Sequence, residues 1–128
     1  MAKKIVVLDT NILIVLFRAR KSFYTFYIQE GIDKAYITYP TYIEFLAGAR
    51  LEDKRLSEKF LKQMDLLPFD EKSQTVGKKL AMQNRLIGKG ATTDMFIASI
   101  CISNNLPLVT SNTSDFNFIG LEVIKYTL

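Results

Sequence analysis

The feature that most constrains the fold is a run of four aliphatic residues, Ile5-Val6-Val7-Leu8, that ends abruptly at Asp9 and Thr10. Such a run, bounded by polar turn residues, predicts a strand that is buried on both faces. Open α/β sheets place their ligands at the carboxyl ends of strands of this kind, and Asp9 stands at that position. The alternative is that Asp9 or Thr10 only caps the helix that follows.

The rest of the chain alternates between strand and helix patterns. We expect further strands at 35–38, 66–69, 107–110 and 121–125, and helices at 11–17, 22–29, 40–50, 53–64, 71–87 and 92–104. Strands that alternate with helices predict an α/β fold, a three-layer α/β/α sandwich with a mostly parallel central sheet. A chain of 128 residues supports one domain, expected to span 1–128.

The absence of histidine narrows the possible chemistry. It excludes Ser-His-Asp triads, zinc sites built on His and His-based acid/base catalysis. Catalysis would have to rest on carboxylates, hydroxyls, amides, Lys, Arg or a metal held by oxygen.

The charge balance, 17 Lys and Arg against 13 Asp and Glu, gives a net charge of +4. With four acids set aside as a cluster, the remainder is 17 minus 9, or +8. A basic surface around an acidic centre suits a polyanion attacked through metal ions. For any single basic patch, a solvated helix face is the simpler explanation.

The sequence gives no sign of a membrane segment, because no apolar run approaches the ~18 residues that span a bilayer. The apolar stretch behind the basic start Met1–Lys4 is broken at Asp9, which argues against a signal peptide. The one cysteine, Cys101, cannot form an internal disulfide. We therefore expect a protein of the reducing cytoplasm.

A second carboxylate, Glu44, follows the strand expected at 35–38. Thr41-x-x-Glu44 matches a capping box, which would make Glu44 structural. Pro40, however, suits the first helical position, which would move the cap to Thr38 or Tyr39 and leave Glu44 free.

A third carboxylate, Asp94, opens a helix that is apolar nearly all round and is expected to be buried. The helix dipole favours an acid in the first turn, so a structural role is possible. Asp94 shares a face with Ile97, Ala98 and Cys101, however, and would stand at the inner end of that helix. This is a suitable place for a metal ligand.

The loop at 110–116 follows the strand expected at 107–110 and carries Asn112 and Asp115. Both are common turn residues, so each alone has an ordinary explanation. Together with Asp9, Glu44 and Asp94, they are expected to meet at the carboxyl edge of the sheet. Carboxylates that converge without His or Cys select Mg²⁺ or Mn²⁺, which can activate water and stabilise charge on a phosphodiester.

The chain resembles, over its whole length, the PIN-domain ribonucleases, in particular the small VapC-type toxins of toxin–antitoxin pairs. The resemblance rests, in family order, on Val7-Leu8-Asp9-Thr10-Asn11, Glu44-Phe45-Leu46-Ala47-Gly48, Asp94-Met95-Phe96-Ile97-Ala98 and Leu108-Val109-Thr110-Ser111-Asn112-Thr113-Ser114-Asp115-Phe116. It implies a three-layer α/β/α domain, Mg²⁺ or Mn²⁺, endonucleolytic cleavage of RNA, a homodimer, and an antitoxin protein that blocks the site.

The resemblance also implies roles for individual residues. Asp9, Glu44 and Asp94 match three acidic positions of the family. Many members have the fourth acid two residues after the position of Thr110, where this chain has Asn112. Asp115 lies where a second family acid often occurs. We therefore expect Asp115 to complete the catalytic set and to bind metal with Asp9 and Asp94. The residues expected to orient these groups are Thr10, Asn11, Thr110 and Asn112.

The expected dimer has a candidate surface early in the chain. The aromatic residues crowded there are Phe17, Phe23, Tyr24, Phe26 and Tyr27. They outnumber what one helix face needs to bury, so we expect a symmetric interface that uses part of this region or the neighbouring helices. A contact within the core of the monomer is the alternative for each of them.

Three other functions compete with this one. A PIN scaffold that binds RNA or protein without cutting it is the main alternative, because the fourth acid is uncertain. A haloacid-dehalogenase-like phosphatase needs a second Asp two residues after Asp9, where this chain has Asn11. A receiver-like signalling domain needs paired acids before the phosphorylated Asp and a late Lys, and neither is evident.

Overall fold

The computed structural model describes residues 3–127, so Met1 and Ala2 of the basic start, and Leu128, lie outside the described part. Within 3–127 there are five strands, namely β1 (Ile5–Leu8), β2 (Lys34–Thr38), β3 (Asp65–Leu67), β4 (Leu108–Thr110) and β5 (Val123–Lys125). The helices are α1 (Thr10–Arg18), α2 (Phe23–Glu30), α3 (Tyr39–Gly48), α4 (Lys54–Leu61), α5 (Glu71–Gln83) and α6 (Ala91–Ser103), with short 3-10 helices η1 (Leu51–Asp53) and η2 (Thr113–Phe116). No helix in this part of the chain combines the length and the apolar character that crossing a membrane requires.

The strands form one sheet in the order β3-β2-β1-β4-β5, and every neighbouring pair is parallel. β1 lies at the centre, where Leu8 pairs with Val109 of β4 and Val7 pairs with Tyr36 of β2. The predicted mostly parallel sheet is confirmed, and it is parallel throughout. Because the strands run the same way, the residues that follow β1, β2 and β4 all emerge at one edge of the sheet.

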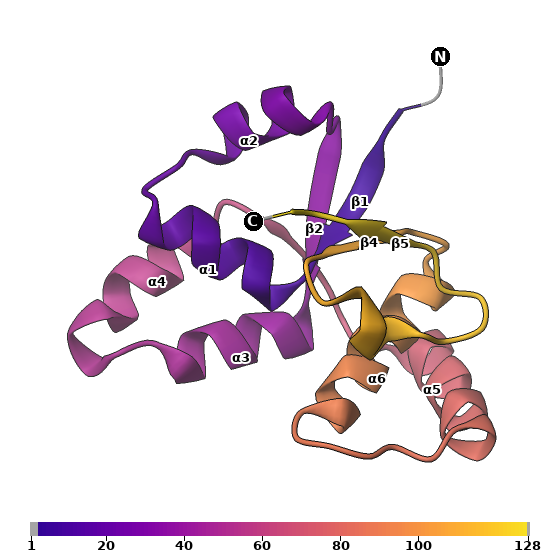
Figure 1. Ribbon diagram of the computed structural model, residues 1–128. Helices are drawn as coiled ribbons and strands as arrows, with labels where there is room; N and C mark the ends of the chain where they lie inside the picture. Colours follow the sequence, from indigo (N-terminus) through magenta and orange to yellow (C-terminus); the bar gives the residue numbers. More distant parts are fainter. Residues whose placement is uncertain (1–2, 128) are drawn as a thin grey trace.

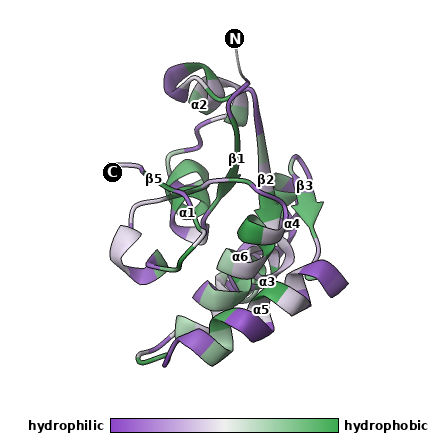
Figure 2. Ribbon diagram, turned by 90° about the vertical axis from the view of Figure 1, so that its right-hand side faces the viewer, coloured by the Kyte–Doolittle hydropathy of each residue, from purple (hydrophilic) through white to green (hydrophobic). Residues whose placement is uncertain are grey.

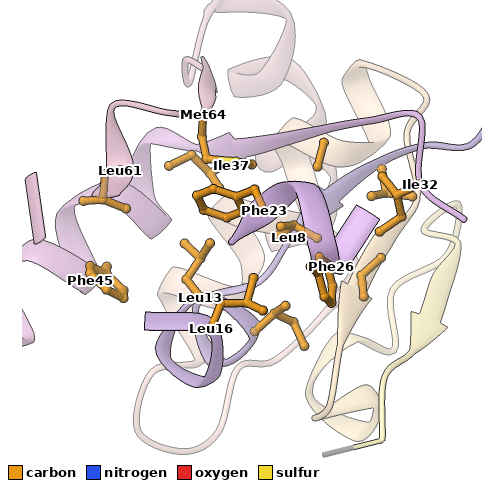
Figure 3. Close-up of a cluster of buried hydrophobic side chains, with 14 residues drawn as sticks. Leu8, Leu13, Leu16, Phe23, Phe26, Ile32, Ile37, Phe45, Leu61 and Met64 are labelled. Atoms are coloured by element: carbon orange, nitrogen blue, oxygen red, sulfur yellow. The ribbon is translucent and has the colours of Figure 1, made fainter. Parts of the chain in front are cut away.

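One face of the sheet is covered by α1, α2, α3 and α4. Side chains alternate across a strand, so Val6 and Leu8 face this side whereas Val7 faces the other. The core on this side is built from large aliphatic and aromatic side chains of the four helices and of β1 and β2 (Figure 3). Those fully or nearly fully buried include Leu13, Leu16, Phe23, Phe26, Ile37, Phe45, Leu61 and Met64.

The opposite face is covered by α6, with α5 packed against α6. Val7 and Leu108 of the sheet meet Ile97 and Cys101 of α6. Burial raises the pKa of the Cys101 thiol to about 12, so this residue is an inert part of the core. Two helical layers with the sheet between them make the predicted α/β/α sandwich (Figure 1). Figure 2 shows β1 as hydrophobic along its length, as a central strand buried on both faces must be.

The helix starts and stops follow local chemistry. Thr38 caps α3 by accepting a hydrogen bond from the backbone N–H of Thr41, with Pro40 in the first turn. The predicted cap at Thr38 or Tyr39 is therefore confirmed. The capping-box explanation of Glu44 is wrong, because Thr41 is not the capping residue. Gly31 ends α2 with a φ of +65°, a left-handed conformation that glycine adopts without strain.

Some boundaries and surfaces differ from the sequence predictions. α5 ends at Gln83 and not near Ile87, whose side chain is 80% exposed. The cause is local: Asn84 is extended, and both its backbone N–H and its side-chain amide donate to the carbonyl of Leu80, which ends the helix.

The early aromatic residues mostly serve the core. Phe23 and Phe26 are buried, and Phe17 and Tyr27 pack against the same cluster. Of the five residues predicted for a dimer surface, only Tyr24 is exposed. The contact within the monomer is therefore confirmed for Phe23 and Phe26, whereas Phe17 and Tyr27 are half-buried beside them.

Candidate active site

The polar edge of the sheet is organised around Asp9 and Thr110, at the ends of the adjacent strands β1 and β4. The backbone N–H of Asp9 donates to the carbonyl of Val109 at 3.0 Å, so the two strand ends are held together. This pairing brings the hydroxyl of Thr110 to 2.7 Å from Asp9 Oδ2, to which it donates. Asp9 Oδ1 accepts from the backbone N–H of Thr10 at 2.8 Å. Both oxygens of a carboxylate that is only 6% exposed are thus bound by donors from the site itself.

The hydroxyl of Thr110 is oriented by its own neighbours. Its oxygen accepts from the side-chain amide of Asn11 at 3.2 Å and from the backbone N–H of Asn112 at 3.1 Å. With both lone pairs engaged, its single proton is directed at Asp9. Asn11 is fixed in turn, because its amide oxygen accepts from the backbone N–H of Ser111 at 3.4 Å.

Glu44 reaches this edge from α3. Helix α3 starts directly after β2, so a residue in its second turn comes near the end of the neighbouring strand β1. Glu44 Oε1 accepts from the hydroxyl of Thr10 at 2.5 Å. Unlike Asp9, Glu44 is exposed.

Asp94 and Asp115 come from α6 and η2. Asp94 lies in the first turn of α6 and is partly buried. Asp115 lies in η2, which returns toward the sheet edge because Phe116 is buried against the α6 side of the core. The backbone N–H of Asp115 donates to the carbonyl of Asn112 at 3.1 Å, which closes the turn, and its side chain is exposed.

The pKa values of Asp9 and Asp94 are raised, in part by the charges of other carboxylates of the site. Burial and then the charges of Asp9, Asp115 and Glu44 raise the pKa of Asp94 from 3.8 to about 7. The pKa of Asp9 is raised chiefly by burial and further by Glu44 and Asp115, against the lowering effect of its two hydrogen bonds. No cation in residues 3–127 contributes to either shift.

The four carboxylates line one open cleft of about 1460 Å³. Its other walls come from α1, α3 and α4, with apolar side chains such as Phe17, Phe45 and Phe60 and basic ones such as Arg18 and Arg20. Acidic, apolar and basic side chains therefore line the same hollow.

The donor chemistry around the carboxylates suits a hard divalent cation. All candidate ligands are oxygen atoms, from carboxylates and hydroxyls, and within residues 3–127 no Lys or Arg forms an ion pair with the carboxylates. As they stand, no three Asp, Glu or Cys residues within 3–127 are close enough together to hold a metal ion. The residues thus fit Mg²⁺ or Mn²⁺ by type and by charge, and the carboxylates would have to draw closer to bind it.

Every residue that the sequence singled out lies in this region. Asp9, Glu44, Asp94, Asp115, Thr10, Asn11 and Asn112 line the cleft, and Thr110 lies beneath it, bonded to Asp9. Residues 84–90, predicted in part to continue the helix at 71–87, instead leave α5 and lie beside Asp94 and Asp115. The sequence signal for this exit is the pair of glycines Gly88 and Gly90.

Comparisons with known proteins agree with this architecture. The family model of the PIN domain matches residues 6–119. No curated protein matches the sequence significantly. Among solved structures, a chain of VapBC-1 from nontypeable Haemophilus influenzae superposes with a TM-score of 0.71 and 26% identity, over 94% of this chain and 97% of that one.

Two DNA-bound complexes show the same fold. A chain of VapBC2 from Rickettsia felis, bound to a promoter fragment, gives a TM-score of 0.77 at 21% identity, over 96% of this chain and 99% of that one. A chain of VapBC from Salmonella typhimurium gives 0.76 at 21% identity, over 98% of this chain and 100% of that one. The resemblance found in the sequence is thereby confirmed, since the family match covers most of the chain and the fold agrees. The chain belongs to the PIN-domain family.

Proposed function

We propose that this PIN domain is a metal-dependent endoribonuclease that cleaves RNA phosphodiester bonds. The observation that carries the proposal is the group of four carboxylates in one open cleft, none of which is in an ion pair within residues 3–127. A divalent cation bound there would balance the charge of the carboxylates and could bind a phosphate of the substrate at the same time.

In this proposal Asp9, Asp94 and Asp115 hold Mg²⁺ or Mn²⁺. Bound there, the ion would supply Lewis-acid chemistry, activating water and offsetting charge on the phosphodiester. Thr110 and the backbone N–H of Thr10 keep Asp9 oriented and favour its ionised form. Asn11 and Asn112 act through Thr110 by fixing its hydroxyl.

Glu44 has a different role in the proposal. Thr10 binds its Oε1, whereas Oε2 has no hydrogen bond within residues 3–127. Because Glu44 is exposed in the cleft and its position is fixed by Thr10, Oε2 is available to accept a proton from the attacking water.

The test is cleavage of a labelled single-stranded RNA with Mn²⁺, with EDTA, and by Asp94→Asn. We expect cleavage with Mn²⁺, none in EDTA, and a loss of at least about 100-fold in Asp94→Asn, comparable to the loss of other electrostatic groups at active sites. Asp65→Asn is the matched control, because Asp65 is exposed and pairs with Lys34 far from the cleft lining. Cleavage that persists in EDTA would contradict the proposal.

A PIN scaffold that binds RNA or protein without cutting is the second candidate. The observation that favours it is that no three acids in residues 3–127 are close enough together to hold a metal. RNA binding by wild-type protein without cleavage in Mn²⁺ or Mg²⁺ would decide for it.

We further propose that the chain is the toxin of a toxin–antitoxin pair and has an antitoxin protein as partner. The support is its fold, which it shares with chains of VapBC complexes. The single buried Cys101 suits the reducing cytoplasm, where such a toxin would meet its RNA. Induced expression should arrest growth, whereas Asp94→Asn should not.

A further inference from the structure

Two hollows meet at the carboxylates. Besides the large cleft, a smaller hollow of about 300 Å³ is formed by residues 84–91 and by side chains of the segment that includes Ser114 and Phe118. Lys89, Asp94 and Asp115 line both hollows. The acidic centre therefore lies between the helices α1, α3 and α4 on one side and the α5–α6 loop on the other.

Unpaired cations line both hollows. In the large cleft they come from the end of α1 and the turn after it, namely Arg18, Arg20 and Lys21; in the smaller hollow they are Arg85 and Lys89. Within residues 3–127 none of these five side chains has an ion pair or a hydrogen bond, whereas Lys34, Arg50 and Lys62 are in ion pairs and Lys54 binds the carbonyls at the end of α3. The five are thus free to bind a ligand.

These cations lie on two sides of the carboxylates and are not paired with them. Helix α1 places Arg18 roughly 13 Å along its axis from Asp9, at 1.5 Å per residue. On the other side, Arg85 and Lys89 line the smaller hollow with Asp94 and Asp115 but form no ion pair with either. The carboxylates therefore have free basic side chains on both sides.

A nucleic-acid backbone complements this pattern. One phosphate would face the carboxylates through a divalent cation, while phosphates before and after it would meet basic side chains. A compact anion would engage only one flank, because the acidic centre separates the two.

We propose that Arg85 and Lys89 bind RNA phosphates on one side of the bond to be cut, and that Arg18, Arg20 and Lys21 bind phosphates on the other side. This proposal rests on the proposed ribonuclease function and assigns its substrate track. Lys89 is held in the hollow by the turn between Gly88 and Gly90, whose φ values are +107° and +83°. These five residues position the substrate and take no part in the chemistry.

The test measures RNA binding separately from cleavage. A fluorescein-labelled single-stranded RNA of mixed sequence is titrated with the Asp94→Asn protein in EDTA between 50 and 200 mM KCl. In this background, Arg85→Gln with Lys89→Gln should weaken binding roughly 10-fold at physiological salt. It should also lower the slope of log affinity against log salt by about 0.7 per lost contact. Arg18→Gln with Arg20→Gln should do the same. Lys89→Arg alone keeps the positive charge and should bind as the Asp94→Asn protein does.

The control pair is Lys78→Gln with Lys79→Gln, which removes the same charge from exposed positions of α5 that line neither hollow. It should leave the salt slope unchanged. Equal losses in the control and loop pairs would overturn the track, because binding would then follow net charge alone. Wild-type binding in both flank variants would also overturn it.

Two further outcomes are separated by the same titration. If none of the proteins binds RNA, the ribonuclease proposal itself fails, and the track with it. Polyglutamate of equal charge could bind as tightly as RNA, and the same variants could lose that binding. In that case the cations bind an acidic protein partner, and the RNA assignment is wrong.

Discussion

Asp9 both caps helix α1 and forms part of the cleft. Its Oδ1 accepts the backbone N–H of Thr10 at the start of α1, as a capping residue would. Its Oδ2 is bound by the hydroxyl of Thr110 from the neighbouring strand, which capping does not require. Capping and a role in the cleft are therefore compatible here.

The Thr110 hydroxyl can be tested by Thr110→Val, which keeps the shape of a fully buried side chain and removes its proton donor. Asp9 Oδ2 would lose its partner, so we expect a stability loss of about 1–3 kcal/mol in urea unfolding. We also expect a 10- to 100-fold loss of metal affinity or activity, as for other residues that support metal ligands. Thr75→Val, at an exposed site on α5, is the control and should change neither. Unchanged metal affinity in Thr110→Val would contradict the orienting role.

Asp94 makes the stability of the metal-free protein depend on pH. Its pKa is about 7 when folded and about 3.8 when unfolded, so between these values the folded state binds more protons and stability falls as pH rises. Asp94→Asn removes this effect. The variant should melt at the same temperature as wild type near pH 4 and at a higher temperature above pH 7, with the difference growing through that window.

The measurement is thermal unfolding in EDTA across this pH range, with Asp65→Asn as the control. By the same linkage, Mn²⁺ should bind progressively more weakly to wild type as the pH falls below about 7. A variant that is less stable than wild type at pH 8 would show that Asp94 has a structural role instead.

At the level of elements, α5 and α6 are held close by small residues. A Cβ at Gly77 would lie 3.2 Å from Ser99 Oγ and 3.4 Å from Phe69 Cζ. Ser99 has little room to yield because its hydroxyl donates to the carbonyl of Met95. Gly77→Val should therefore cost about 1–3 kcal/mol by overpacking. Gly48→Val, where a Cβ meets nothing within 4 Å, should be near neutral in the same unfolding measurement. Equal effects at both sites would contradict tight packing of α5 on α6.

The elements were predictable where local patterns decide them. The run at 5–8 gave the correct strand, and Pro40 with Thr38 gave the correct helix cap. The end of α5 was not predictable, because the apolar spacing continues to Ile87 while the chain leaves the helix at Asn84. That exit depends on Asn84 binding the carbonyl of Leu80 and on the left-handed Gly88 and Gly90, which together place the loop beside Asp94.

The residues of the site were also predictable only where the sequence pattern places them at a strand end or a helix start. Asp9, Glu44 and Asp94 follow from the rule that parallel strands end at one edge, since each lies just after a strand or at a helix start facing it. The position of Asp115 depends on how η2 turns back and buries Phe116, a tertiary contact that no local pattern encodes.

At the scale of the whole molecule, most aromatic residues between Phe17 and Tyr27 pack against the core. The outer face of α2 carries Tyr24 and Ile28, whose side chains are 75% and 63% exposed. We expect a symmetric dimer at micromolar concentration that uses this face. Light scattering should give twice the monomer mass, and Tyr24→Ser with Ile28→Ser should shift it toward monomer. Leu51→Ser with Met82→Ser, equally exposed elsewhere, is the control. A wild-type monomer would contradict the prediction.

The central claim, that the carboxylates form a divalent metal site, is tested most directly by the anomalous signal of Mn²⁺ in a soaked crystal. The account predicts Mn²⁺ within ~2.0–2.6 Å of oxygens of Asp9 and Asp94, with Asp115 bound directly or through one water. Mn²⁺ bound by Asp9 and Asp94 with Asn112 in place of Asp115 would correct the assignment of the fourth position. A fully soaked crystal with no Mn²⁺ at these carboxylates would contradict the account.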